Sequence, residues 1–483
     1  MSSRFADSLR TAAIISVVLS SWCLAQDDKA EPAKPKAIVP PPKITISKET
    51  TWATEPLRPD GFVDYLEVVN RRSSKNVTIE KNACVLLYQA MGPNPDQTRQ
   101  QDRFFRRMGI EPLPDEGEYF QSWGQLVGGP RIAIDRPWTA GDFPDLAAWL
   151  KSNELPLATL TAATQRPRYF SPLVNPTAVP DGGLLELSLP GVHHCRQLAR
   201  ALLARAMWEL AEGSQVDAWR DLMTVHRLGR LVGQGPTLIE SLVGFAIESL
   251  AFQAEFRFLS ETKPSTKMLS HYRKQLARLP ARASIADKFD LFERLTFLDC
   301  AQRVAHGQLS LQTIAGGDED NSLVEKLAER AIAQTVDWNE LLKSGNKWYD
   351  RLAEIAREQD FLERSAAIRK LDQELKVLVE KRREPMASLP LLGGKPAITQ
   401  AMSDTLISHL HPAVGQVLCA EGRAIQRMHN LELAFTLAQW RNEHDSYPES
   451  LDKLAPNYIP KVPKDHFNDQ SLKYERIADG YRF

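Results

Sequence analysis

The sequence predicts a mainly α-helical protein, an irregular helical array or bundle closed by a small C-terminal α+β cap of one short helix and a β-hairpin. Apolar residues recur every three or four positions from Val192 to Arg441, which is the pattern of amphipathic helices. Helix-capping signals open several of these segments. The last fifty or so residues instead combine prolines with a turn signal between two short apolar runs.

Residues 1–25 have the form of a secretory signal peptide. Arg4 and Arg10 precede the apolar run Ala12–Leu24, which ends in Cys23-Leu24-Ala25. The run is shorter than the roughly 20 apolar residues that a membrane-spanning helix needs. We therefore expect cleavage after Ala25 and a soluble mature chain, periplasmic or secreted, that keeps no transmembrane segment.

Residues 26–48 are rich in proline and lysine and predict an extended tether. Residues 49–190 predict an N-terminal helical region with long loops. Helices are expected from Gly61 through Val69 and from Thr78 to Met91, where Gly92-Pro93 stops the second. The rest of this region is rich in proline and glycine, with short helices expected at 145–151 and 154–164.

Residues 191–430 predict the helical array. The helix that starts near Val192 is apolar on two faces, because Trp208 lies opposite Leu202 and Ala206. Thr237-x-x-Glu240 is a capping box that opens a helix over 238–259, and Ser284-x-x-Asp287 opens another that runs to 306. Successive helices with two apolar faces are typical of stacked arrays, although no regular repeat period is present.

The second helix of the array separates apolar from charged residues. Its expected apolar side carries Val216, Trp219, Leu222, Met223 and His226, and its expected charged side carries Asp217, Arg220, Asp221 and Arg227. Further along, Phe361, Ile368 and Leu375 keep a seven-residue spacing. So short a heptad pattern favours a helical hairpin inside the protein.

Residues 431–483 predict a separate C-terminal module. Pro448 biases Tyr447 towards an extended conformation, so the helix through Trp440 should end there. Asp479-Gly480 is a turn signal between two strand-like runs. Because two strands alone are marginally stable, we expect this hairpin to pack against the helix that carries Phe435, Leu437 and Trp440.

This tail resembles the C-terminal globular part of type II secretion major pseudopilins. The residues that carry the resemblance are Tyr447-Pro448, the Leu-rich stretch 451–454, the segment Tyr458-Ile459-Pro460-Lys461-Val462-Pro463 and the terminal hairpin. The family's Asp-Pro-Trp/Phe stands here as Asp465-His466-Phe467, and its Asp-x-Gly as Glu443-His444-Asp445.

The resemblance covers only the tail and does not imply polymerisation. The preceding helix carries Arg423 and Arg427, unlike the apolar anchor of the family. The loop calcium of some family members would fall near Asp465 and Asp469, which otherwise are solvated loop carboxylates.

Composition and cysteine spacing exclude several classes of site. Sixty basic against 61 acidic residues give a net charge of −1, which favours no nucleic-acid partner. Four cysteines remain after cleavage, Cys84, Cys195, Cys300 and Cys419, too widely spaced for a zinc ribbon or a CxxC redox site. They leave open three disulfide pairings or single buried thiols.

Five motifs could carry chemistry, and each has a plainer structural interpretation. His193-His194-Cys195 and His409-x-His411 offer metal-ligating atoms but lack the spacing of known zinc motifs. Gly393-Gly394-Lys395 lacks the spacing of a phosphate loop. His226 is interpreted as a hydrogen-bonded core histidine rather than a catalytic base.

The fifth motif is a stripe of acidic residues, which dimetal bundles and acid–base sites use. No Glu-x-x-His partner helix accompanies it, so we favour a stripe that is solvated or paired with Arg205 or Arg230. The stripe consists of Glu240, Gly244, Glu248 and Glu255.

The sequence therefore predicts a non-enzymatic helical protein that binds another protein of the cell envelope through the concave side of the array. No catalytic residue, metal or cofactor is assigned, and the oligomeric state stays open. The alternative is a hydrolase or another enzyme whose site is built from loops in residues 92–190, with Asp115, Glu116 or Asp135 as its acids.

Overall fold

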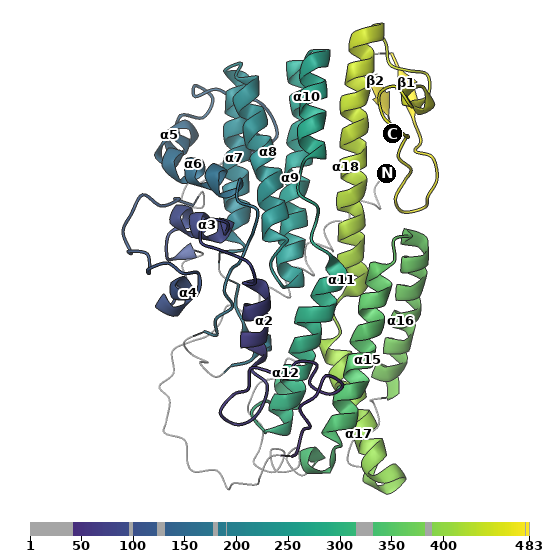
Figure 1. Cartoon of the computed structure of the whole chain (residues 1–483). Coiled ribbons are helices and arrows are strands. Elements are labelled where there is room, and N and C mark those ends of the chain that lie inside the picture. The colour runs from purple at the N-terminus through teal and green to yellow at the C-terminus, as the bar shows by residue number, and fades with distance from the viewer. Residues whose placement is uncertain are drawn as a thin grey trace. The chain divides into compact units, whose positions relative to one another are not determined.

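The structure is a computed structural model that describes residues 42–95, 100–122, 131–176, 182–189, 191–314, 332–381, 389–478 and 480–482. Most of these residues are helical, and a two-stranded antiparallel hairpin lies close to the C-terminus (Figure 1). The predicted mainly α fold with a small terminal hairpin is thus confirmed. The expected signal peptide, 1–25, and most of the expected tether lie outside the described residues.

The N-terminal region holds short helices, of which the first two begin later than expected and those at 144–152 and 154–163 lie where they were predicted. Asp64 accepts a hydrogen bond from the backbone of Glu67, so the first helix starts at Tyr65 rather than near Gly61. The Asn82 side chain caps the second helix, which starts after it rather than at Thr78. The elements are α2 (Tyr65–Ser73), α3 (Ala83–Met91), α4 (Asp102–Arg107), η3 (Arg131–Ile134), α5 (Pro144–Ser152), α6 (Glu154–Ala163) and η4 (Leu184–Glu186).

Three long helices, α7 (His194–Ala211), α8 (Gln215–Val232) and α9 (Leu238–Thr262), lie side by side (Figure 1). The predicted capping box opens α9, since Thr237 Oγ1 accepts from the Glu240 amide and the Glu240 carboxylate accepts from the Thr237 amide. A Cβ atom at Gly244 would lie 2.5 Å from the Gly229 carbonyl oxygen. Glycine at this crossing therefore allows α8 and α9 to approach closely.

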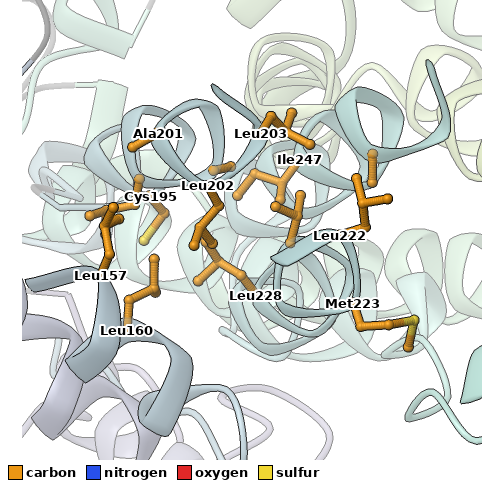
Figure 2. Close-up of a cluster of buried hydrophobic side chains, with 14 of the residues drawn as sticks. Leu157, Leu160, Cys195, Ala201, Leu202, Leu203, Leu222, Met223, Leu228 and Ile247 are labelled. Carbon is orange, nitrogen blue, oxygen red and sulfur yellow. The ribbon is translucent and has the colours of Figure 1, made fainter. Parts of the chain in front are cut away.

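The first hydrophobic core joins these helices to α3, α6 and the later helix α10 (Thr266–Ala277), which the sequence analysis did not foresee. Figure 2 shows Leu157 and Leu160 of α6 facing Cys195 of α7, with residues of α8 and α9 beyond them. Trp208, on the opposite face of α7, stacks on Trp138 with 5.6 Å between ring centroids. Both faces of α7 are therefore covered, as predicted.

A second core is built from the helices that follow. The helix predicted from Ser284 to 306 is interrupted by a π-helical turn, although Ser284 caps its start as expected. Ile44 and Ile46, at the end of the expected tether, pack against this core. Its elements are α11 (Ile285–Lys288), η5 (Phe289–Glu293), α12 (Arg294–Ala305), α13 (Leu311–Ile314), α15 (Trp338–Arg357), α16 (Phe361–Lys381) and α17 (Leu389–Leu410).

The helix α18 (Val414–His444) connects this second core to the tail and is 31 residues long. Its C-cap Asp445 adopts a left-handed conformation with φ 56°, so the helix ends just before Tyr447-Pro448. The tail continues with the 3-10 turn η7 (Leu451–Leu454) and the strands β1 (Glu475–Ile477) and β2 (Gly480–Arg482). Arg476 pairs with Tyr481 at the centre of this hairpin.

A third, small core holds the tail on α18, through two of the three residues predicted. Phe435 points into the first core, where its ring lies 5.5 Å from that of Trp219. Trp440 is only half-buried. The predicted Leu437 and, one turn before it, Leu433 are buried against the tail together with Leu451, Leu454 and Ile459. Trp440 packs against this core as well.

Within the described residues, no helix combines the length and the apolar content that crossing a bilayer would require.

Candidate functional site

The acidic stripe of α9 lies inside the protein. Glu240 and Glu255 have no exposed surface and Glu248 has 1%, so the solvated alternative is wrong. The stripe faces α8 rather than water, because Gly229 and Gly244 bring the two helices together. Buried carboxylates require ionic or hydrogen-bonded partners, and each of the three has a different one.

Glu248 is paired with arginines, as one alternative from the sequence predicted. Arg230 of α8 donates from Nε to Glu248 Oε2 at 2.9 Å. Arg282, beyond α10, donates to both oxygens of the same carboxylate at 3.1 and 2.8 Å. Burial raises the pKa of Glu248, but His226 and the two guanidinium groups outweigh that effect and lower it to about 2.

His226 is a buried, hydrogen-bonded core residue, as predicted. Its Nε2 lies 3.0 Å from both carboxylate oxygens of Glu255. Burial lowers the pKa of His226, whereas Glu255 and Glu248 raise it, and the result is about 9. His226 thus lies between the two glutamates of α9, bonded to Glu255 and with its Nδ1 3.9 Å from Glu248 Oε2. It has no exposed surface through which a substrate could reach it.

The other expected pair, between the stripe and Arg205, does not form. Arg205 binds Asp221 instead, with Nε and Nη2 at 2.6 and 2.8 Å from its two oxygens. Asp221 is therefore buried, not on an exposed charged side of α8 as predicted, and Val216 of the expected apolar side is 71% exposed. Glu240, the remaining acid of the stripe, interacts with the buried Lys288, whose pKa is lowered by burial to about 8.

The histidines of the two motifs lie in or beside helices and contact neighbouring protein groups. His194 lies in the first turn of α7 and is buried. His409 Nδ1 lies 2.8 Å from the carbonyl oxygen of Thr405, one turn earlier. His411 receives a hydrogen bond from Trp348 Nε1 at 3.2 Å, and burial lowers its pKa to about 4. Among the described residues, no group of three or more His, Cys, Asp or Glu side chains is arranged to hold a metal ion.

No disulfide joins the cysteines of the described ranges. Cys84, Cys195 and Cys300 are buried thiols, and Cys419 is partly exposed. Burial raises the pKa of the Cys84 and Cys300 thiols well above the ordinary value, which makes both poor nucleophiles.

The acids of the alternative loop site are exposed and scattered. Asp115 and Glu116 lie on one loop, and Asp135 lies just after η3. The Asp135 backbone carbonyl accepts from Arg257, near the end of α9. None of these three carboxylates lines either of the two hollows described below.

The two acids of the family's calcium loop have local partners. Asp469 forms an ion pair with Lys464 at 2.6 Å. Asp465 accepts from the Phe467 amide at 2.8 Å within a turn.

Gly394, in the glycine pair tested as a phosphate loop, breaks α17 with a φ of 64°.

Two surface hollows lie where the tail meets the helices. The first, of about 470 Å³, opens between the last turns of α18 and the segment after η7. The rings of Trp440 and His444 stack in it with centroids 4.0 Å apart, and Tyr458 lies 5.3 Å from Trp440. Its lining residues are Gln439, Trp440, Glu443, His444, Lys453, Asn457 and Tyr458.

The second hollow, of about 370 Å³, lies between the start of α16, α18 and the tail segment 461–469. His466 packs against Phe361, with ring centroids 5.1 Å apart, and its backbone amide donates to Gln426 of α18. A Cβ atom at Gly422 would lie 3.2 Å from the His466 ring, so this glycine allows the tail to lie directly on α18.

Sequence reasoning did not identify either hollow as a site. A signal was present for the first, because Trp440 and His444 are four residues apart on one face of a helix and Glu443 is their neighbour. Tyr458 joins them only through the path of the tail, which spacing alone does not reveal. Comparison with protein-family models, curated proteins and solved structures found no match to this chain.

Proposed function

We propose that this chain is an exported, soluble helical scaffold that binds another protein of the cell envelope and has no catalytic activity. The observation that carries the proposal is that both hollows lie on the tail surface and combine aromatic rings with charged groups. Aromatic residues surrounded by polar ones are typical of the anchor points of protein interfaces. The tail, rather than the concave side of the array, is therefore the favoured binding surface.

An enzyme that used the buried charges between α8 and α9 has less support. A general acid or base must come within hydrogen-bond distance of its substrate. His226 and Glu255 are fully buried, and Glu248 has 1% of its surface exposed. These groups therefore account for the packing of α8 and α9 without a reaction.

Site-specific photo-cross-linking in the producing cells tests the binding function. A photoreactive amino acid at Asn457, on the first hollow, or at Lys461, on the second, should cross-link one defined envelope protein. The same amino acid at Lys347, an exposed position of α15, is the matched control and should give no such product. Equal products from all three positions, or none from the two hollows, would contradict the proposal.

Export is tested by the mass of the mature protein. The basic start and the short apolar run predict that the chain begins at Gln26 after processing. Mass spectrometry of the protein from cell fractions should find this N-terminus in the periplasm or the medium. Retention of Met1, or extraction only with detergent, would show that the export proposal is wrong.

A further inference from the structure

We propose that the hollow formed by Trp440, Glu443 and Tyr458 binds the guanidinium group of an arginine side chain on the partner protein. This inference rests on the proposed binding function and specifies what the partner presents. It follows from the geometry of the hollow, its charge and the rigidity of its walls.

The walls of the hollow are aromatic. Trp440 and His444 stack with only 11° between their ring planes, and Tyr458 is inclined to Trp440 by 52°. All three rings line the same hollow. Aromatic faces attract cations through their quadrupole, and the planar guanidinium also stacks on them, which an ammonium cannot do.

The hollow also holds a carboxylate without a cationic partner. Glu443 accepts a hydrogen bond from the Tyr458 hydroxyl at 2.5 Å, and Gln439 lies 3.4 Å from its other oxygen. In the described part of the chain, no basic side chain forms an ion pair with Glu443, whereas Lys453 at the edge is paired with Glu449. Burial and Glu443 together raise the pKa of Tyr458 to about 12, which accords with a negative local potential.

The site is held in place before any ligand binds. Arg273 of α10 donates to the Tyr458 carbonyl at 2.7 Å and to Gln439 at 3.1 Å. His444 Nδ1 lies 3.0 Å from the Trp440 carbonyl oxygen. Little ordering is therefore required when a side chain enters, which favours its use as an anchor within a larger interface.

The chemistry excludes other ligands of similar size. A phosphate or carboxylate would meet the unpaired Glu443, and a purely apolar group would leave that carboxylate and the nearby amides without water. A guanidinium satisfies both, because its edge donates to the carboxylate and its face covers a ring.

The test is an NMR titration of the full-length mature chain, followed through the indole N–H signal of Trp440, which a Trp440→Phe variant assigns. N-acetyl-arginine amide should shift this signal and saturate in the millimolar range, because one exposed cation contact is weak. N-acetyl-citrulline amide has nearly the same shape without the charge. It should bind about fivefold more weakly or not detectably.

Two isosteric variants separate the hollow from the rest of the surface. Glu443→Gln keeps an acceptor for Tyr458 but removes the charge, and should weaken arginine-amide binding about fivefold. Asp452→Asn removes a charge from exposed residue 452 in η7, outside the hollow, and should leave binding unchanged. Melting curves monitored by circular dichroism should coincide for all three proteins.

Equal shifts with the arginine and citrulline probes, or equal binding by the native chain and the Glu443→Gln variant, would overturn the arginine proposal. Photo-cross-linking at Asn457 is an independent measurement. Its persistence alongside a negative titration would retain the binding function and reject only the arginine site.

Discussion

Replacing Glu248 by Gln should destabilise the protein by about 3–5 kcal/mol, because it removes a buried anion that faces three cationic groups. Arg230 and Arg282 would lose the carboxylate that they share, and His226 would keep only that of Glu255. The change is nearly isosteric, so it leaves the packing against Gly229 intact. Urea unfolding at pH 7, followed by circular dichroism, measures the difference.

Glu261→Gln on the same helix is the matched control. Glu261 forms an exposed ion pair with Arg257 and should change stability by no more than about 1 kcal/mol. A similarly small effect of Glu248→Gln would show that the buried cluster contributes little net stability.

The dependence of this difference on pH identifies its cause. The pKa of Glu248 is about 2 in the folded chain, below its ordinary value of 4.5. The stability that the charged form contributes is therefore fully present above pH 4.5 and is lost as the pH falls towards 2. The cost of Glu248→Gln should shrink over that range, and a cost independent of pH would assign it to packing.

The charged cluster between α8 and α9 also shows which features of the protein interior can be predicted from the sequence. Spacing along α9 placed Glu240, Glu248 and Glu255 on one side of a helix, and a pairing with Arg230 was among the alternatives. Whether that side is solvent-exposed or buried depends on how closely the neighbouring helix packs against it. Gly229 of α8 and Gly244 of α9 allow the two helices to approach closely and so to bury the stripe. The periodicity of α9 alone could not show this.

Helical periodicity likewise predicts a side of a helix but not which turns are covered. Val216 shares the apolar side of α8 with Trp219, yet it lies in the first turn and is 71% exposed. In the tail, the sequence predicted that the hairpin docks on α18 through Phe435, Leu437 and Trp440. Leu437 and Trp440 do pack there, but Leu433 takes the place of Phe435. The prediction had no information on the first core, which takes Phe435.

The candidate site was less predictable than the fold. Trp440, Glu443 and His444 are neighbours on α18, but they form a hollow only together with Tyr458. The path of the tail after α18 brings Tyr458 to them. Local patterns such as caps and apolar periods are encoded within one helix. A hollow between a helix and a distant segment of the chain depends on how the two pack together, which local sequence patterns do not show.

Deleting residues 446–483 should lower the stability of the remaining helices and expose apolar surface on α18. Leu433 and Leu437 would lose the cover of Leu451, Leu454 and Ile459. Exposing two leucines that are now fully buried costs about 3–6 kcal/mol, since each contributes roughly 1.5–3. Keeping Asp445 preserves the helix C-cap, so the loss reports the tail rather than fraying.

Thermal melting by circular dichroism and binding of a hydrophobic dye measure this effect. A point variant in the intact chain tests the same contact without removing any residues. Leu437→Ala in the intact chain should cost about 2–5 kcal/mol, whereas Val216→Ala, at an exposed position, should cost almost nothing. The tail alone should not fold, because each of its strands has only three residues. An unchanged melting temperature after the deletion, together with a folded isolated tail, would instead establish the tail as an independent module. Its two hollows would then serve only to recognise a partner, without a role in closing the helical body.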